Sequence, residues 1–154
     1  MTTKENYVPS ATHHDADVVL RLYDLRREET MRRARAWMVG DFWPQKIDDV
    51  LAITNGSFAQ SAYFRQIVSF CEMACSLPLH GAVHPELFTD WCGEILFIFA
   101  KFKPLLPEIR EKINPSFLGN TEKFIQSSEY VKQKFAATEA RARAFGERVM
   151  AAKK

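Results

Sequence analysis

The stretch that decides the fold is Tyr63-Phe-Arg-Gln-Ile-Val-Ser-Phe-Cys-Glu-Met-Ala-Cys-Ser-Leu77, which is followed by Pro78. At about 100° per residue, apolar side chains cover most of the surface of a helix over these positions. They are Phe64, Ile67, Val68, Phe70, Cys71, Ala74 and Cys75. A helix that is apolar on nearly every side usually lies at the centre of its domain. The sequence therefore predicts a domain built around a helix that ends near Leu77.

Helices are also expected on both sides of this stretch, because no segment alternates with the period of two that a strand requires. One helix is expected over 15–39, where Gly40 ends it, and a short one after Pro44. Another is expected over 85–103, followed by short pieces divided by prolines, and a long amphipathic helix over about 128–152. We predict an all-α fold: an irregular bundle of four main helices with two or three short ones.

The chain of 154 residues suits one domain over 15–154, preceded by a flexible polar arm over 1–14. The start of the chain has no apolar segment of the kind found in signal peptides, and the longest apolar run, 95–100, is far too short to span a membrane. Three cysteines form an odd set that argues against a secreted disulfide framework. We expect a cytoplasmic protein without a membrane partner.

The charges are nearly balanced, with 21 basic and 19 acidic residues and a net charge of +2. Nucleic-acid binders usually concentrate basic residues, because their affinity comes from neutralising phosphates. The richest basic segment, 26–35, is diluted by Glu28 and Glu29. Nucleic acid is therefore not an expected partner. Nucleic-acid binding through segment 26–35 remains a third hypothesis for function.

Charged residues fall on the apolar side of the helix expected over 15–39. Arg26, Glu29 and Arg33 lie within the same stripe as the apolar residues of that helix. The polar strip of the central helix adds Arg65 and Glu72, which are about 10 Å apart along the axis and so cannot pair with each other. Glu94, at the edge of another apolar face, is a weaker candidate for the same network.

Three interpretations of this Arg/Glu cluster remain open. The charges could form salt bridges between helices that fix the packing of the bundle. They could instead line a polar pocket that binds an anion or a small molecule, or performs acid–base chemistry, since perturbed charges gather at such sites. They could also be exposed, if the helical positions assigned to residues 15–39 are wrong.

No metal, cofactor or catalytic residue is expected. His80 and His84 have a spacing that suits a metal on a helix, but Gly81 and Pro85 argue against a helix there. No Cys-x-x-Cys or Glu-x-x-His pattern occurs, and cysteines usually pack as small apolar residues. Phosphate-binding glycine loops and the motifs of hydrolases are also missing.

The C-terminal segment has the 4-3-4-3-4 spacing of a heptad seam. The seam consists of Val131, Phe135, Thr138, Ala142, Phe145 and Val149. Such a helix could fold back on its own domain, or it could pack on a second copy or another protein. We expect a homo-oligomer or protein partner to use Val131, Phe135, Phe145 and Val149.

Parts of the chain resemble bacterial families of small helical proteins of unknown function. The resemblance is carried by Tyr23-Asp-Leu-Arg-Arg-Glu-Glu29, by Tyr63-Phe-Arg65 with Phe70-Cys-Glu72, and by the segment from Gly81 to Phe88 that ends Glu-Leu-Phe. It covers roughly residues 20–127 and implies neither an activity nor a ligand.

Together these observations favour a non-enzymatic helical interaction or regulatory module that self-associates. The alternative is a protein that binds a small molecule or an anion, or a hydrolytic one, through the interior cluster of Arg26, Glu29, Arg33, Arg65 and Glu72.

Overall fold

The computed structural model describes residues 9–56 and 58–154. Within these ranges the chain is helical and contains no strand, which confirms the predicted all-α class. The helices are α1 (His13–Arg27), α2 (Glu29–Ala36), α3 (Ile47–Thr54), α4 (Ala59–Leu79), α5 (Pro85–Trp91), α6 (Gly93–Phe102), α7 (Leu106–Lys112), α8 (Gly119–Ile125) and α9 (Glu129–Ala152), with a π-helical turn η1 (Trp37–Asp41) and a 3₁₀ turn η2 (Lys103–Leu105).

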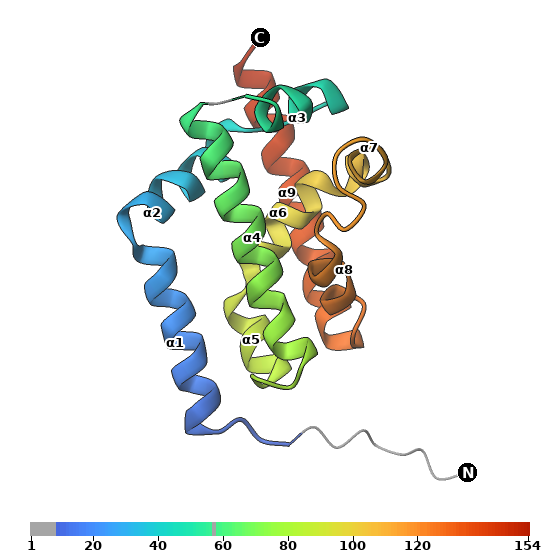
Figure 1. The fold of residues 1–154 in the computed structure, drawn as a ribbon. Coiled ribbons are helices and arrows are strands. Elements are labelled where there is room, and N and C mark those ends of the chain that lie inside the picture. The colour runs from blue at the N-terminus through green and yellow to red at the C-terminus, as the bar shows by residue number, and fades with distance from the viewer. Residues whose placement is uncertain (1–8, 57) are drawn as a thin grey trace, which may run out of the picture.

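Helix α4 lies in the middle of the bundle, between α2 and α8, as its apolar surface predicts (Figure 1). Its buried residues include Phe64, Ile67, Cys71 and Ala74. The helix ends at Leu79, two residues beyond the expected end, because a proline in the last turn removes only one intrahelical hydrogen bond.

The helix expected over 15–39 is broken at Glu28. The backbone of Glu28 is extended, with ψ of 145°, and its carboxylate accepts hydrogen bonds from the N–H groups of Thr30 and Met31 at 3.0 and 2.9 Å. Glu28 therefore acts as the N-cap of α2. No glycine or proline marks this break in the sequence. As a result α1 lies at the edge of the bundle and α2 takes a different direction (Figure 1).

Two further boundaries differ from the expected ones. The helix expected over 85–103 is divided at Cys92 into α5 and α6, so the bundle contains more and shorter helices than the predicted four main ones. The arm expected over 1–14 is shorter than predicted, because α1 begins at His13 with Thr12 as its N-cap. The part of that arm before residue 9 lies outside the described residues.

The π-helical turn is held by a buried lysine. Lys101 of α6 is only 8% exposed, and its Nζ donates to the carbonyls of Met38 and Phe42 at the end of η1. It also lies 4.8 Å from the centre of the Trp43 ring. Burial lowers the pKa of Lys101 to about 7, with Lys153 acting in the same direction. The two carbonyls oppose this shift because they stabilise the charged form.

The C-terminal helix packs on its own domain. Val131, Phe135, Thr138 and Ala142 of the seam are buried, and the Phe135 ring lies 5.6 Å from that of Phe99 on α6. The expected partner surface is therefore wrong for Val131 and Phe135, which the same chain already covers. Farther along α9, the partly buried Phe145 and Val149 continue the seam.

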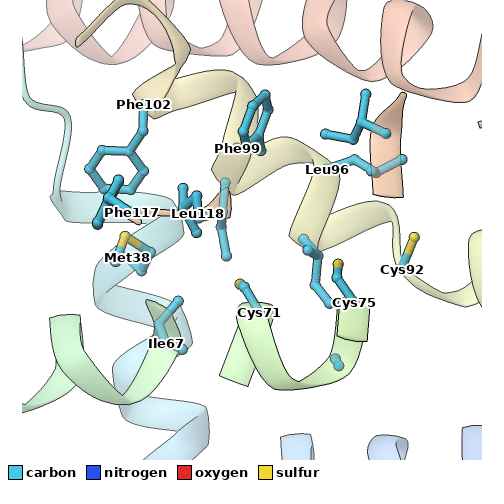
Figure 2. Packing of buried hydrophobic residues seen from close by; sticks show 14 of the residues in the cluster. Met38, Ile67, Cys71, Cys75, Cys92, Leu96, Phe99, Phe102, Phe117 and Leu118 are labelled. Atoms are coloured by element: carbon cyan, nitrogen blue, oxygen red, sulfur yellow. The ribbon is translucent and has the colours of Figure 1, made fainter. Parts of the chain in front are cut away.

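The core beneath α6 is made of aromatic and aliphatic side chains together with all three cysteines. Figure 2 shows Cys71 and Cys75 of α4 and Cys92, at the α5–α6 junction, among apolar residues such as Leu96 and Phe99. The three thiols are free and buried. Burial raises the pKa of Cys75 to about 12 and raises that of the other two as well. These side chains are neutral and pack as small apolar residues.

Candidate functional site

The five residues expected to form an interior cluster do not meet in the structure, and each contacts a different part of the chain. Glu29 and Arg33 pair with each other on the surface of α2, and both side chains are more than 60% exposed. Such an exposed pair contributes little to stability. Arg65 is exposed on α4. The predicted stripe is wrong at Glu29 and Arg33, because the break at Glu28 means that residues 15–39 do not form one continuous helix.

Glu72 has a structural role that the sequence did not indicate. Its carboxylate accepts hydrogen bonds from the backbone N–H groups of Asn120 and Thr121, at 2.9 and 3.0 Å, and from the Thr121 hydroxyl at 2.8 Å. These groups lie in the first turn of α8, where backbone donors have no partner within the helix. Within the described residues no ion pair joins Glu72 to an arginine, so the idea of a salt bridge to the first helix is wrong.

Arg26 is half-buried and lies against two aromatic rings. Its guanidinium carbon lies 5.2 Å from the centre of the Tyr23 ring on its own helix and 5.6 Å from that of Trp91 on α5. Cation–π contacts of this kind contribute about 0.5–2 kcal/mol, with the larger values where the cation is desolvated. They hold the end of α1 against α5.

The ion pair beside Arg26 is formed by two residues from α2 and α6. Arg35 Nε and Nη2 donate to the two carboxylate oxygens of Glu94 at 2.6 and 2.8 Å, while Arg35 Nη1 donates to the backbone carbonyl of Arg26 at 3.3 Å. The hydrogen bonds to Glu94 raise the pKa of Arg35. Glu94 was the weaker sequence candidate. Arg35 was missed because it is one of several neighbouring arginines, and the sequence alone does not show which of them points into the bundle.

A cavity of about 10 Å³ lies at the junction of α1, α2, α4, α5 and α6. Arg26, Arg35, Trp91 and Glu94 supply its polar lining, and the rest is aliphatic, aromatic or thiol. Arg26 Nε and Trp91 Nε1 are both buried and have no hydrogen-bond partner within the described part of the chain. Buried donors are almost always paired in proteins, so these two nitrogens are exceptions within the described part of the fold.

The other end of α1 is fixed to the start of α5. Asp15 accepts a hydrogen bond from the backbone N–H of His84 at 2.8 Å. His84 Nδ1 accepts from the N–H of Leu87, so Nε2 carries the ring proton and donates to the carbonyl of Pro9 at 2.6 Å. His84 therefore acts as the N-cap of α5.

Helix α1 exposes large apolar side chains on two different sides. Leu20 is 60% exposed, Leu25 53% and Tyr23 38%, whereas only Leu22 of this helix is fully buried. Single exposed apolar residues such as Leu25 are ordinary, but Leu20 and Tyr23 lie on the same side of the helix and together indicate a contact surface.

The site does not contain the groups needed for nucleophilic or metal chemistry. Its two cysteines, Cys71 and Cys92, have raised pKa values because they are buried, and the thiolate is the reactive form. In residues 9–56 and 58–154 no group of three or more His, Cys, Asp and Glu side chains is arranged to hold a metal ion. What the site offers is hydrogen-bond donors and positive charge.

A protein-family model matches most of the chain. The model of DUF4760, a domain of unknown function, matches residues 11–128. This range contains α1 to α8 and all the residues of the cavity, and α9 begins directly after it. No curated protein and no solved structure matches the chain. None of the described helices is long and apolar enough to cross a membrane.

Proposed function

The chain belongs to the DUF4760 family of domains of unknown function, and we propose that it is a non-enzymatic helical interaction module that self-associates through the outer face of α1. We define this face by Asp17, Leu20, Tyr23 and Arg27. The exposure of Leu20 and Tyr23 is the observation that carries the proposal. It replaces α9, whose seam is largely buried, as the expected contact helix.

The charges of this face favour a second copy of the same chain as the partner. Asp17 lies near the N-terminal end of the face and Arg27 at its C-terminal end. When two α1 helices pack antiparallel, Asp17 of each lies opposite Arg27 of the other, and Leu20 lies opposite Tyr23. Both pairings have nearly the same midpoint in the sequence, as a two-fold symmetric contact requires. Arg27 also rests against the Tyr23 ring at 5.5 Å, which keeps its charge on this face.

The expected dimer is weak. A contact between two single helix faces buries less than the roughly 1,200–2,000 Å² of a standard stable interface. We therefore expect a dissociation constant on the order of micromolar, or about −8 kcal/mol. The small net charge of +2 opposes association only slightly. The three free, buried cysteines support a reducing, cytoplasmic location for the module.

Sedimentation velocity over a series of protein concentrations tests the proposal. The parent should change from monomer to dimer as concentration rises, and Leu20→Glu should remain a monomer. Leu25→Glu is the matched control, because Leu25 is similarly exposed on the same helix but lies about 140° away from Leu20. It should dimerise like the parent.

Charge reversal sharpens the test. Asp17→Arg and Arg27→Asp should each weaken the dimer, and the double variant should restore it. A parent that stays monomeric at every concentration, or equal loss of dimer in Leu20→Glu and Leu25→Glu, would show that this face is not an interface.

A further inference from the structure

A groove that the proposed self-contact does not use runs along α9 where this helix meets α5 and α6. Two hollows of about 780 and 570 Å³ lie there, and both are lined by Gly93, Thr138 and Arg141. Because the hollows share these residues, they form one continuous groove. Its floor contains Phe97 and Phe145, which are partly exposed and meet edge to face with 5.9 Å between their ring centres. Helices α1 and α9 lie on different sides of α4, so this groove is separate from the face of α1 (Figure 1).

Positive charge lines the α9 wall of the groove. Lys134, Arg141 and Arg148 are exposed there, at a spacing of seven residues. Seven residues are close to two helical turns, so these positions follow one another at about 10.5 Å along one flank of α9. Within the described residues none of the three forms an ion pair. The acidic residues of α9 line neither hollow.

Contacts within the chain hold two of these cations beside the groove. Arg141 Nη2 donates to the Thr138 hydroxyl at 3.2 Å. The guanidinium carbon of Arg148 lies 5.7 Å from the centre of the Phe145 ring. A side chain that is already held in place loses less conformational entropy when it pairs with a ligand.

The carboxylates on the opposite wall do not cancel this charge. Glu94 lines the groove, but Arg35 donates to both of its oxygens and neutralises it. Asp90 lines only the hollow that contains Lys134. The surplus of positive charge therefore lies toward the C-terminal part of α9.

We propose that this groove binds an acidic amphipathic helix of another protein. Carboxylates spaced by seven residues on that helix pair with Arg141 and Arg148, because the same spacing spans two turns in both helices. Apolar residues between the carboxylates cover Phe97 and Phe145. Gly93 allows the close approach, since even a Cβ added there would have no neighbour within 4 Å.

The apolar floor favours a helix over a nucleic acid. A phosphate backbone could neutralise the basic residues, but it would leave the two partly exposed rings uncovered. An amphipathic helix presents charged and apolar groups on neighbouring stripes, which matches a basic wall beside an apolar floor.

Binding of a synthetic peptide, followed by fluorescence anisotropy, tests the proposal. The probe has roughly 20 residues, enough for a helix, with glutamate at every seventh position, leucine between the glutamates, and alanine and glutamine elsewhere. The parent should bind it with a dissociation constant on the order of 10 μM, as expected for a small interface. Raising the salt from about 0.1 to about 1 M shortens the Debye length from about 10 to about 3 Å and should weaken binding about tenfold.

Matched variants locate the site. Arg141→Glu and Arg148→Glu should each weaken binding about fivefold or more, because each loses an ion pair and gains a repulsion. Arg143→Glu is the control, because Arg143 is exposed on the same helix but lines neither hollow. It should bind within about twofold of the parent, since exposed charges at a distance are screened. Gly93→Leu should block binding by filling the groove while keeping the Tm of the parent.

Exchange of the charges sharpens the test. A peptide with lysine in place of glutamate should bind the double variant Arg141→Glu/Arg148→Glu and not the parent. Leu20→Glu should bind the glutamate peptide as the parent does, because α1 does not line the groove.

Four outcomes would overturn the proposal. One is a parent that does not bind the glutamate peptide, and another is equal loss of binding in Arg141→Glu and Arg143→Glu. Loss of binding in Leu20→Glu would place the peptide on α1 instead. Tighter binding of a mixed-sequence DNA duplex than of the peptide at the same salt would make the groove a nucleic-acid surface.

Discussion

Removal of the Glu72 carboxylate should destabilise the protein through α8. The carboxylate accepts three hydrogen bonds from the first turn of that helix, and Thr121, which supplies two of them, is 0% exposed. In Glu72→Ala, the buried N–H and hydroxyl of Thr121 both lose their acceptor. Loss of a helix cap costs about 0.5–2 kcal/mol, and a hydrogen bond to a charged group contributes about 1.5–3 kcal/mol. Because such contributions are not additive, we expect the free energy of unfolding of Glu72→Ala to be lower than that of the parent by about 2–4 kcal/mol.

The measurement is urea unfolding followed by circular dichroism at pH 7. Glu72→Gln should lose less than Glu72→Ala, since its amide oxygen can still accept from Thr121 while its NH₂ group faces the N–H of Asn120. Glu111→Ala, at an exposed position on α7, is the control and should change stability by less than about 0.5 kcal/mol. The free energy of unfolding of a protein is usually about 5–15 kcal/mol, so the expected difference between Glu72→Ala and the parent is easily measured.

Double-mutant cycles identify the partner of Glu72. Glu72→Ala should couple with Thr121→Val, because both remove the same hydrogen bond, and should be additive with Arg26→Ala. The reasoning would be refuted if Glu72→Ala were as stable as the parent, or if it coupled with Arg26 instead of Thr121.

Two other predictions concern the region around η1 and α9. Burial lowers the pKa of Lys101 from 10.5 to about 7, so between these values the unfolded chain binds the additional proton and stability rises with pH. From pH 7 to 9 the parent should gain about 2 kcal/mol relative to Lys101→Met in urea unfolding, and parallel pH profiles would contradict this. A Cβ on Gly146 would lie 2.6 Å from the Trp43 ring, so Gly146→Ala should lower the Tm although alanine favours helix. Gly93→Ala, with nothing within 4 Å of the new atom, should keep or raise the Tm, and the reverse order would refute the packing argument.

The centre of the fold could be predicted because it depends on composition within one helix. Phe64, Ile67 and Cys71 are apolar wherever their neighbours lie, so α4 could be placed inside the bundle from its own sequence. Helix boundaries at Glu28 and Cys92 could not, because no glycine or proline marks them. At Glu28 the break depends on the carboxylate, which accepts from the N–H groups of Thr30 and Met31. The free-energy difference between this arrangement and a continuous helix is small, because such local side-chain hydrogen bonds compete with the backbone hydrogen bonds of the helix.

The candidate site was predicted only in part for a related reason. Arg26 was identified and Glu94 was noted, but the ion pair needs Arg35. On a continuous helix Arg35 lies outside the apolar stripe, and the break at Glu28 turns it toward Glu94 of α6. Lys101 offered a signal that was not used: it is a charged residue inside an apolar segment from Ile95 to Phe102. Such a residue either reaches water or finds carbonyl acceptors, and here it finds the end of η1.

The packing of α9 on α6 also has a consequence for how the protein is made on the ribosome. The residues of α6 that α9 covers, such as Phe99, are synthesised well before Phe135, their partner. At about 5–20 residues per second, the 24 residues of α9 take roughly 1–5 s to appear. During that interval the nascent chain carries an uncovered aromatic surface on α6. Chaperones that bind apolar segments would therefore meet this protein at α6, and its release from them would follow the arrival of α9.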